Sequence, residues 1–371
     1  DLLGNSDDYR FERFGDYLEA LDRTPAAANA AFLIGHSTLR LGAMSDVDRP
    51  ANTSEIDAMA KVVEEAMQSG ATGFSTGLIY APNKAAPTDE IVAIAEVAGD
   101  KGGIYVTHMR NEAAEIDKSL DETFEIGRRA DLPVIVSHHK CAGKENHGHS
   151  VETLARFDKA LKKQKVGLDV YPYTAGSTVI MVDMVDAAER VIITWSETRP
   201  EFSGRDLADI ALELGCSKRD AAAQLIPGGA IYFFMDEADV QRILSYPHAM
   251  VGSDGLPHDS HPHPRLWGTF PRVLGHYARE LGLMSLEEAV RRMTGLSAEQ
   301  FGLKDRGVIR TNALADITLF DPETVIDCAT FEKPMTPAAG IDLVMVNGEI
   351  IREQGRTTGA KPGRALRRNA V

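Results

Sequence analysis

Short apolar runs alternate with longer amphipathic stretches along most of this chain. The apolar runs predict strands, which are expected at 31–35, 73–77, 103–107, 133–137, 166–171 and 249–253. Between them, 54–70, 88–102 and 112–130 carry apolar residues at helical spacing, and Ser54 is the expected cap of the first helix. Strands that alternate with helices in this way are typical of βα units and a parallel sheet.

Two regions depart from this repeat. Six strands are visible, whereas a closed parallel barrel needs eight. The stretch 181–244 is expected to be an insertion or lid on a barrel domain that spans 1–304. From about residue 305 the pattern changes to short strands at 308–309, 315–320, 343–346 and 349–352, separated by turn residues that include Asn347-Gly348. Residues 305–371 are therefore expected to form part of a small β module and a tail.

Composition narrows the class of protein. The 371 residues are 43% hydrophobic and 26% charged, with a net charge of -15. Such an acidic chain is a poor binder of nucleic-acid phosphates, and no apolar run approaches the roughly 18 residues of a spanning helix. Three cysteines without a CxxC pair exclude a four-cysteine zinc site and suit a reducing compartment. We expect a cytoplasmic protein that acts on a small molecule, with no nucleic-acid or membrane partner; the sequence leaves its oligomeric state open.

Three residues that can bind a metal stand at the ends of predicted strands. His108, His138 and Asp254 each follow an apolar run directly. Active sites of parallel barrels are built at the C-terminal ends of the strands, where the strand ends converge. Two imidazoles and one carboxylate are a recurrent ligand set for catalytic zinc. Each residue alone could equally be a cap or a hydrogen-bonded core residue, but three at equivalent positions indicate a shared site.

Further polar residues fall in loops of the same barrel face. They are His36, Tyr80, Lys140, Tyr171, Ser177 and Arg265. Lysine and arginine there suit a substrate carboxylate, although a solvated loop cation is an equally valid interpretation of each. Two HxH pairs, His147 with His149 and His261 with His263, raise the alternative of a second metal site. The Pro and Gly residues around them do not ensure that both rings share a side.

Several runs occur in an order that resembles a known family. They are Gly35-His36-Ser37, Thr107-His108-Met109-Arg110-Asn111-Glu112, Ser137-His138-His139-Lys140, Gly252-Ser253-Asp254-Gly255, Met293-Thr294-Gly295-Leu296-Ser297-Ala298 and Ala315-Asp316-Ile317-Thr318-Leu319-Phe320-Asp321. This pattern resembles the amidohydrolase superfamily and, within it, the D-aminoacylase (N-acyl-D-amino-acid deacylase) family. The resemblance implies a TIM-like (β/α)8 metal-dependent hydrolase barrel, with strands three to eight in this chain, and a small β-sandwich module.

The resemblance also implies an activity and a site. The activity would be zinc-dependent hydrolysis of the amide bond of N-acyl-D-amino acids, with one tightly bound zinc ion and a second left open. His108 and His138 would be zinc ligands, and Asp254 the catalytic base. The substrate, chiefly its α-carboxylate, would be held by Lys140, Tyr80, Tyr171, Ser177 and Arg265.

One departure from the family keeps other interpretations open. The family's first strand carries an HxH pair and its second a zinc-binding cysteine, but no histidine or cysteine precedes His36 here. We expect a fragment of a longer protein, with a shorter variant or a completing partner chain as alternatives. A cyclic-amide hydrolase of the hydantoinase or dihydropyrimidinase kind is disfavoured because 73–77 has no lysine to carbamylate. The missing ligands favour a metal-free scaffolding relative, whereas His108, His138 and Asp254 oppose it.

Overall fold

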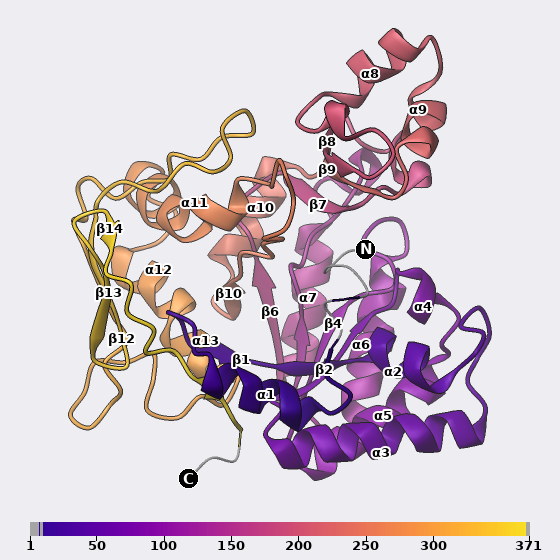
Figure 1. The fold of residues 1–371 in the computed structure, drawn as a ribbon, viewed down its shortest axis with the longest axis horizontal. Coiled ribbons are helices and arrows are strands. Elements are labelled where there is room, and N and C mark those ends of the chain that lie inside the picture. The colour runs from indigo at the N-terminus through magenta and orange to yellow at the C-terminus, as the bar shows by residue number, and fades with distance from the viewer. Residues whose placement is uncertain (1–6, 8–9, 369–371) are drawn as a thin grey trace.

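The computed structural model describes residue 7 and residues 10–368, and a six-stranded parallel sheet forms its centre (Figure 1). In spatial order the strands are β10 (Ala249–Val251), β6 (Val166–Val170), β5 (Val134–Val136), β4 (Ile104–His108), β3 (Gly73–Gly77) and β2 (Leu33–Gly35). All five pairings are parallel. The six predicted strands are confirmed, each within two residues of its expected bounds. Successive strands are neighbours, so their C-terminal ends lie along one edge of the sheet.

Helices pack on the outer face of this sheet. They are α2 (His36–Ala43), α3 (Thr53–Ser69), α4 (Ala81–Lys84), α5 (Thr88–Asp100), α6 (Ile116–Arg129), α7 (Ser150–Leu161) and α10 (Glu237–Ser245). Alternation along β4 sends Tyr105 into the large core beneath these helices, whereas Ile104 and Val106 face the inside of the curved sheet. There they pack with Leu296 of α13 (Gly295–Gln300). The alternating pattern thus produces two separate apolar layers.

Two helices begin at residues other than those expected. Asn52, not Ser54, caps α3, because its side chain accepts from the Glu55 N–H while the Glu55 carboxylate accepts from the Asn52 N–H. The helix expected from residue 112 begins only at Ile116. The Asn111 side chain accepts from the backbone N–H groups of residues 113 and 115, a local turn that competes with helix formation. Glu112 is therefore a loop residue.

The chain leaves the barrel after β6 to build a separate lobe. Its antiparallel sheet has the order β7 (Ala175–Val179), β9 (Gly228–Phe233), β8 (Arg190–Ser196), and it carries α8 (Leu207–Leu214) and α9 (Lys218–Gln224). Figure 1 shows α8 and α9 projecting from the rest of the molecule. The excursion starts with β7, earlier than the expected residue 181. Helix α10, expected inside the insertion, instead packs on α7 and β10 with the barrel helices.

A second antiparallel sheet lies near the C-terminus. After α11 (Arg265–Arg272), a π-helical segment (Val273–Glu280) and α12 (Leu286–Met293) come β11 (Ile317–Phe320), β12 (Ile341–Val346), β13 (Glu349–Glu353) and β14 (Arg356–Thr357). The predicted turn Asn347-Gly348 joins β12 to β13 with positive φ at both residues, as a two-residue hairpin loop requires. The strand expected at 308–309 was wrong, since no strand is found there.

The two ends of the described chain meet beside the barrel. Helix α1 (Phe14–Arg23) precedes β1 (Ala30–Ala31), which pairs in parallel with β15 (Ala365–Leu366). The basic tail is thus anchored through residue 366. Within residues 7 and 10–368, no helix is both long and apolar enough to cross a bilayer. The domain boundary near residue 304 stays a prediction.

Candidate active site

Two histidines from neighbouring strands bring their ring nitrogens together. His108 ends β4, and His138 lies two residues beyond β5. His108 Nδ1 and His138 Nε2 are 3.0 Å apart, and their rings are nearly perpendicular. Burial lowers the pKa of His108 to about 3, so this imidazole is neutral and has a lone pair at ordinary pH. The two histidines expected at neighbouring strand ends thus lie side by side, 3.0 Å apart at their ring nitrogens.

A buried glutamate, which sequence reasoning did not single out, completes this cluster. The carboxylate oxygens of Glu112 each lie 2.7 Å from Lys140 Nζ, and Oε1 is 3.0 Å from His138 Nδ1. His108 Nε2 lies 3.6 Å from Oε2. Burial alone would raise the pKa of Glu112, but Lys140 and the two imidazoles outweigh it and hold this pKa well below its usual range. The signals for it in the sequence were the spacing His108-x-x-x-Glu112 and its place in the run 107–112 that resembles the family.

Asp254 lies across the same cavity and is paired with Arg265. Its Oδ2 is 2.9 Å from Arg265 Nη1, and its side chain keeps 34% exposure while that of Arg265 keeps 1%. Burial opposes ionisation of Asp254, but the guanidinium outweighs it, so the pKa of Asp254 lies below its ordinary value. Asp254 is therefore an ionised carboxylate near neutral pH and can accept a proton.

Tyr80 reaches the site from the loop after β3. Its hydroxyl is 2.9 Å from Thr178 Oγ1, and its ring centroid is 5.1 Å from that of His108. Burial raises the pKa of Tyr80 to about 12, so the phenol keeps its proton. The Tyr80 ring can lie here only because residue 77 is glycine: a Cβ at Gly77 would lie 2.7 Å from the ring.

Tyr171 and Ser177 approach from the far end of β6 and from the lobe. The Arg265 guanidinium lies 4.7 Å from the centroid of the Tyr171 ring, and Arg265 Nη2 donates to the Ser177 carbonyl. Ser177 Oγ is buried and, among the described residues, has no hydrogen-bond partner. Such a group is ready to bind a ligand, because buried hydroxyls are normally satisfied.

All eight residues that the family resemblance implied for the site line one cavity of about 80 Å³. This volume holds several water molecules. Six of them come from the C-terminal ends of barrel strands or from the loops that follow: Tyr80, His108, His138, Lys140, Tyr171 and Asp254. The lobe supplies one wall through Ser177 of β7 and Tyr232 of β9. The insertion was predicted to cover the barrel, and the shared cavity explains how it contributes to the site.

Two of the strand-end residues have an unusual backbone. His138 has φ of 40° and Asp254 has φ of 48°, both in the left-handed region. Residues other than glycine adopt this region only when the surroundings enforce it, and such positions cluster at functional sites. For His138 one enforcing contact is the Asp169 carboxylate, which accepts from its backbone N–H at 2.9 Å.

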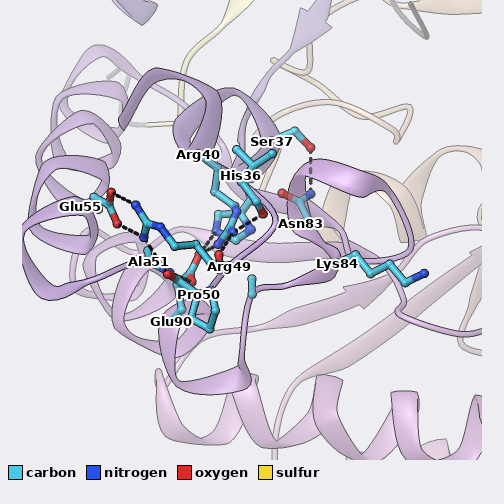
Figure 2. A network of polar contacts seen from close by, with 12 residues as sticks. His36, Ser37, Arg40, Arg49, Pro50, Ala51, Glu55, Asn83, Lys84 and Glu90 are labelled. Carbon is cyan, nitrogen blue, oxygen red and sulfur yellow. Dashed lines mark hydrogen bonds and ion pairs between the residues drawn. The ribbon is translucent and has the colours of Figure 1, made fainter. Parts of the chain in front are cut away.

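The other sequence candidates lie outside the cavity. His36 is fully buried in a cluster with Glu90 and Arg40 (Figure 2). The structure gives no support to a second metal site at an HxH pair, because the cluster of three possible ligands found within the described residues does not include those histidines. His261 and His263 each place Nε2 against a backbone carbonyl oxygen, of Phe331 and Ala175 respectively.

The residues at the histidine pair fit a metal ion. His108, Glu112 and His138 each offer a ligand atom, all within 4.8 Å of one another. The two facing ring nitrogens are close to the separation of about 3.3 Å that two nitrogens bound at about 2.0–2.1 Å to one tetrahedral zinc would have. A buried, neutral imidazole such as that of His108 also suits zinc as a donor.

The fold and this site define a metal-dependent hydrolase barrel. The family model described as "Amidohydrolase family" matches residues 8–352, and the chain belongs to this family, in the branch that contains D-aminoacylase. The expected α/β barrel fold and family resemblance are thereby confirmed.

Three relatives place the chain within the family. A D-aminoacylase of Alcaligenes xylosoxydans xylosoxydans is 55% identical over 371 residues, which cover 100% of this chain and 77% of that protein. A D-aminoacylase crystal structure has a TM-score of 0.97 and 54% identity over 99% of this chain and 78% of that one. The N-acyl-D-glutamate deacylase of Bordetella bronchiseptica, complexed with zinc and a phosphonate inhibitor, has a TM-score of 0.94 and 45% identity over 96% and 75%.

Proposed function

We propose that this protein hydrolyses the amide bond of N-acyl-D-amino acids with the help of zinc, releasing a carboxylate and a free D-amino acid. The observation that carries this proposal is the pair of ring nitrogens of His108 and His138, 3.0 Å apart, in a cavity that Asp254 also lines. The relatives support it, because two are named for this kind of reaction and one was crystallised with zinc.

His108 and His138 would hold the zinc ion, and Asp254 would move the proton. Zinc in such sites polarises the carbonyl and makes water a better nucleophile at neutral pH. The ionised Asp254 carboxylate takes a proton from the attacking water at one of its oxygens. It then delivers that proton to the amine nitrogen, which leaves poorly unless it is protonated. Arg265, which pairs with Asp254, keeps the carboxylate ionised between turnovers.

Lys140 and Arg265 would orient the substrate through its α-carboxylate. Arg265 is almost completely buried, and its Nε has no hydrogen-bond partner within the described chain. Tyr80 and Tyr171 keep their phenolic protons because burial raises the pKa of both, so each can donate to an anionic ligand. A fixed carboxylate and a fixed acyl carbonyl leave one side of the α-carbon for the side chain. Selection of one stereoisomer follows from this three-point arrangement.

The cavity wall favours an uncharged substrate side chain. Met181, Met184, Leu256 and Phe234 contribute apolar surface to it. Among the described residues that line the cavity, the cations are Lys140 and Arg265, and each already faces a carboxylate of the protein. A second substrate carboxylate would have no cation of its own. We therefore rank an N-acyl-D-methionine above N-acyl-D-glutamate and N-acyl-D-aspartate.

The test is to measure amino-acid release from N-acetyl-D-methionine, N-acetyl-D-glutamate and N-acetyl-D-aspartate, each beside its L form. We expect release from the D forms, fastest for methionine, at least about 100-fold above the matching L form. Equal rates for a D and L pair, or no release from any of the six, would contradict the proposal. A cyclic amide such as a hydantoin serves as the control for the rival activity, and metal analysis addresses the metal-free alternative. A cytoplasmic location remains a prediction from composition.

A further inference from the structure

We propose that Glu112 is a positioning residue for the metal site. Its carboxylate accepts the N–H at His138 Nδ1 and faces His108 Nε2, the two outer nitrogens, which turns the inner nitrogens, His108 Nδ1 and His138 Nε2, toward one shared cation. The proposal rests on the proposed function only in taking zinc as that cation. It assigns a role to a buried carboxylate that the reaction described above leaves unused.

The geometry separates the inner nitrogens from the outer ones. His108 Nδ1 and His138 Nε2 face each other at 3.0 Å. The opposite nitrogens point to a single carboxylate, His138 Nδ1 at 3.0 Å from Oε1 and His108 Nε2 at 3.6 Å from Oε2 of Glu112. A neutral imidazole carries its proton on one nitrogen and its lone pair on the other. A carboxylate that takes the outer proton of His138 therefore leaves the inner lone pair of this ring free for a metal. Its charge favours the same tautomer of His108, whose Nε2 has no hydrogen-bond partner among the described residues.

Lys140 competes with Glu112 for His138 Nδ1 and so could favour the other tautomer of this ring. Its Nζ lies 2.7 Å from His138 Nδ1 as well as 2.7 Å from each Glu112 oxygen. If the ammonium donated to His138 Nδ1, the imidazole proton would move to Nε2 and point at His108, which would block the metal position. Glu112 prevents this by holding the ammonium and by accepting from Nδ1 itself. Removal of its charge shifts the balance toward the blocked tautomer.

The alternative role for Glu112 is that of a direct metal ligand. Its oxygens are close enough to the histidines to be counted with them as possible donors. Both oxygens are engaged by Lys140, however, and they lie beside the outer ring nitrogens rather than beside the facing pair. A carboxylate placed on the remote nitrogen of a metal-binding histidine fixes its ring orientation and tautomer, and loss of such a partner typically costs 10–100-fold in metal affinity.

The backbone holds Glu112 in place for this task. The Glu112 carbonyl accepts from the Ala142 N–H at 2.8 Å, which ties the loop after β4 to the loop that carries Lys140. The Asn111 side chain closes the turn on the other side of Glu112. The side chain of Glu112 is 9% exposed. The carboxylate is thus fixed by loop contacts that do not involve a metal.

The chain offers a matched control in Glu90. This carboxylate is also buried, also faces a histidine at 3.2 Å and also pairs with a cation, Arg40 (Figure 2). It contacts neither His108 nor His138. Glu90→Gln therefore removes a buried charge of the same kind without touching the metal position.

The experiment measures zinc affinity of the full chain by competition with a chromophoric chelator, together with the visible absorption of the cobalt-loaded protein. Variants are Glu112→Gln, Glu112→Ala, the control Glu90→Gln, and the double variant Glu112→Gln with Lys140→Met, which removes both charges if the single variant folds poorly. We expect zinc to bind 10–100-fold more weakly in every Glu112 variant, with Gln weakened less than Ala because its amide oxygen still accepts an N–H. Glu90→Gln should stay within about twofold of the parent chain.

Each outcome decides the proposal. Unchanged zinc affinity in the Glu112 variants would reduce Glu112 to a partner of Lys140 and overturn it. A changed cobalt spectrum at saturation in Glu112→Gln would make Glu112 a ligand and also overturn it, as would a parent chain that binds no zinc. If zinc affinity falls as expected but no N-acyl-D-amino acid is hydrolysed, the proposed function fails and the role of Glu112 stands.

Discussion

Two buried clusters in this protein are built from the same parts, a glutamate, a histidine and a cation. Glu90 binds His36 and Arg40, while Glu112 binds His138 and Lys140. Both lie near the C-terminal edge of the parallel sheet. The second cluster lines the cavity, and there the ring nitrogens of two histidines face each other.

The Glu90 cluster is closed by the protein's own backbone. Arg40 donates to the carbonyls of Val47 and Arg49, and Glu90 accepts from the Ala51 N–H, so the loop before α3 covers the charges. His36, Arg40 and Glu90 are each at most 1% exposed. The comparison teaches that composition does not separate a structural cluster from a functional one. What differs is whether the cluster is covered by the protein's own backbone or lines a cavity where a ligand can reach it.

The largest expected effect is at the cavity that the Glu112 cluster lines. Asp254→Asn should lower kcat by about 10²–10⁴-fold, because the amide cannot take the proton from water, while zinc binding is largely kept. The measurement is steady-state hydrolysis with zinc content determined on the same sample. Asp259→Asn is the control, since Asp259 is a buried carboxyl of the same loop that does not line the cavity. Retention of more than about a tenth of kcat in Asp254→Asn would mean that another group is the base.

In the Glu90 cluster, the substitution Glu90→Gln should lower the stability of the fold instead of the activity. Loss of one partner leaves the Arg40 guanidinium buried without a counter-charge, which typically costs about 3 kcal/mol of the free energy of unfolding. Chemical denaturation monitored by circular dichroism measures this. KM and zinc affinity should hardly change. A variant as stable as the parent chain would show that the buried pair contributes nothing.

Acid should reduce the contribution of the Glu90 cluster to the free energy of unfolding. Burial would raise the pKa of Glu90, but His36, the Ala51 N–H and Arg40 outweigh it and lower this pKa below 4.5, and burial lowers the pKa of His36 below 6.5. Both groups bind fewer protons when folded than when unfolded, so the free energy of unfolding falls as pH drops below 6.5 and again below 4.5. The stability difference between the parent chain and Glu90→Gln should therefore shrink between pH 5 and pH 3. A constant difference across that range would contradict it.

The smallest effect is expected at Tyr80, whose ring lies beside His108. Tyr80→Phe removes the hydroxyl that pairs with Thr178 at 2.9 Å and that can donate to a ligand. A hydrogen bond of this kind contributes about 1 kcal/mol, so kcat/KM should fall about fivefold with little change in zinc content. Tyr232→Phe is the matched control, because its hydroxyl bonds to backbone groups of the lobe. Equal losses in both variants would indicate a general effect of the lobe on the site.

Sequence reasoning placed the strand-end residues correctly. His108, His138 and Asp254 follow short apolar runs, and parallel βα units bring such positions to one edge of a sheet regardless of loop detail. It misplaced Glu112, because amphipathic spacing extended α6 four residues too far and hid a loop held by Asn111. It also grouped His36 with the polar residues of the barrel face, although His36 is buried beside Glu90 and Arg40.

The barrel class came from the resemblance to a known family. The sequence pattern by itself determined the six strands of the parallel sheet and the histidine, lysine and aspartate positions at their ends. These follow from local periodicity, since alternation and helical spacing are written along the chain. Only the tertiary structure decided which glutamate meets which histidine, that the lobe strand carrying Ser177 forms a wall of the cavity, and that His138 and Asp254 adopt left-handed backbone. Those outcomes depend on contacts between residues far apart in the chain and on which polar groups are left unsatisfied, and neither has a local signature.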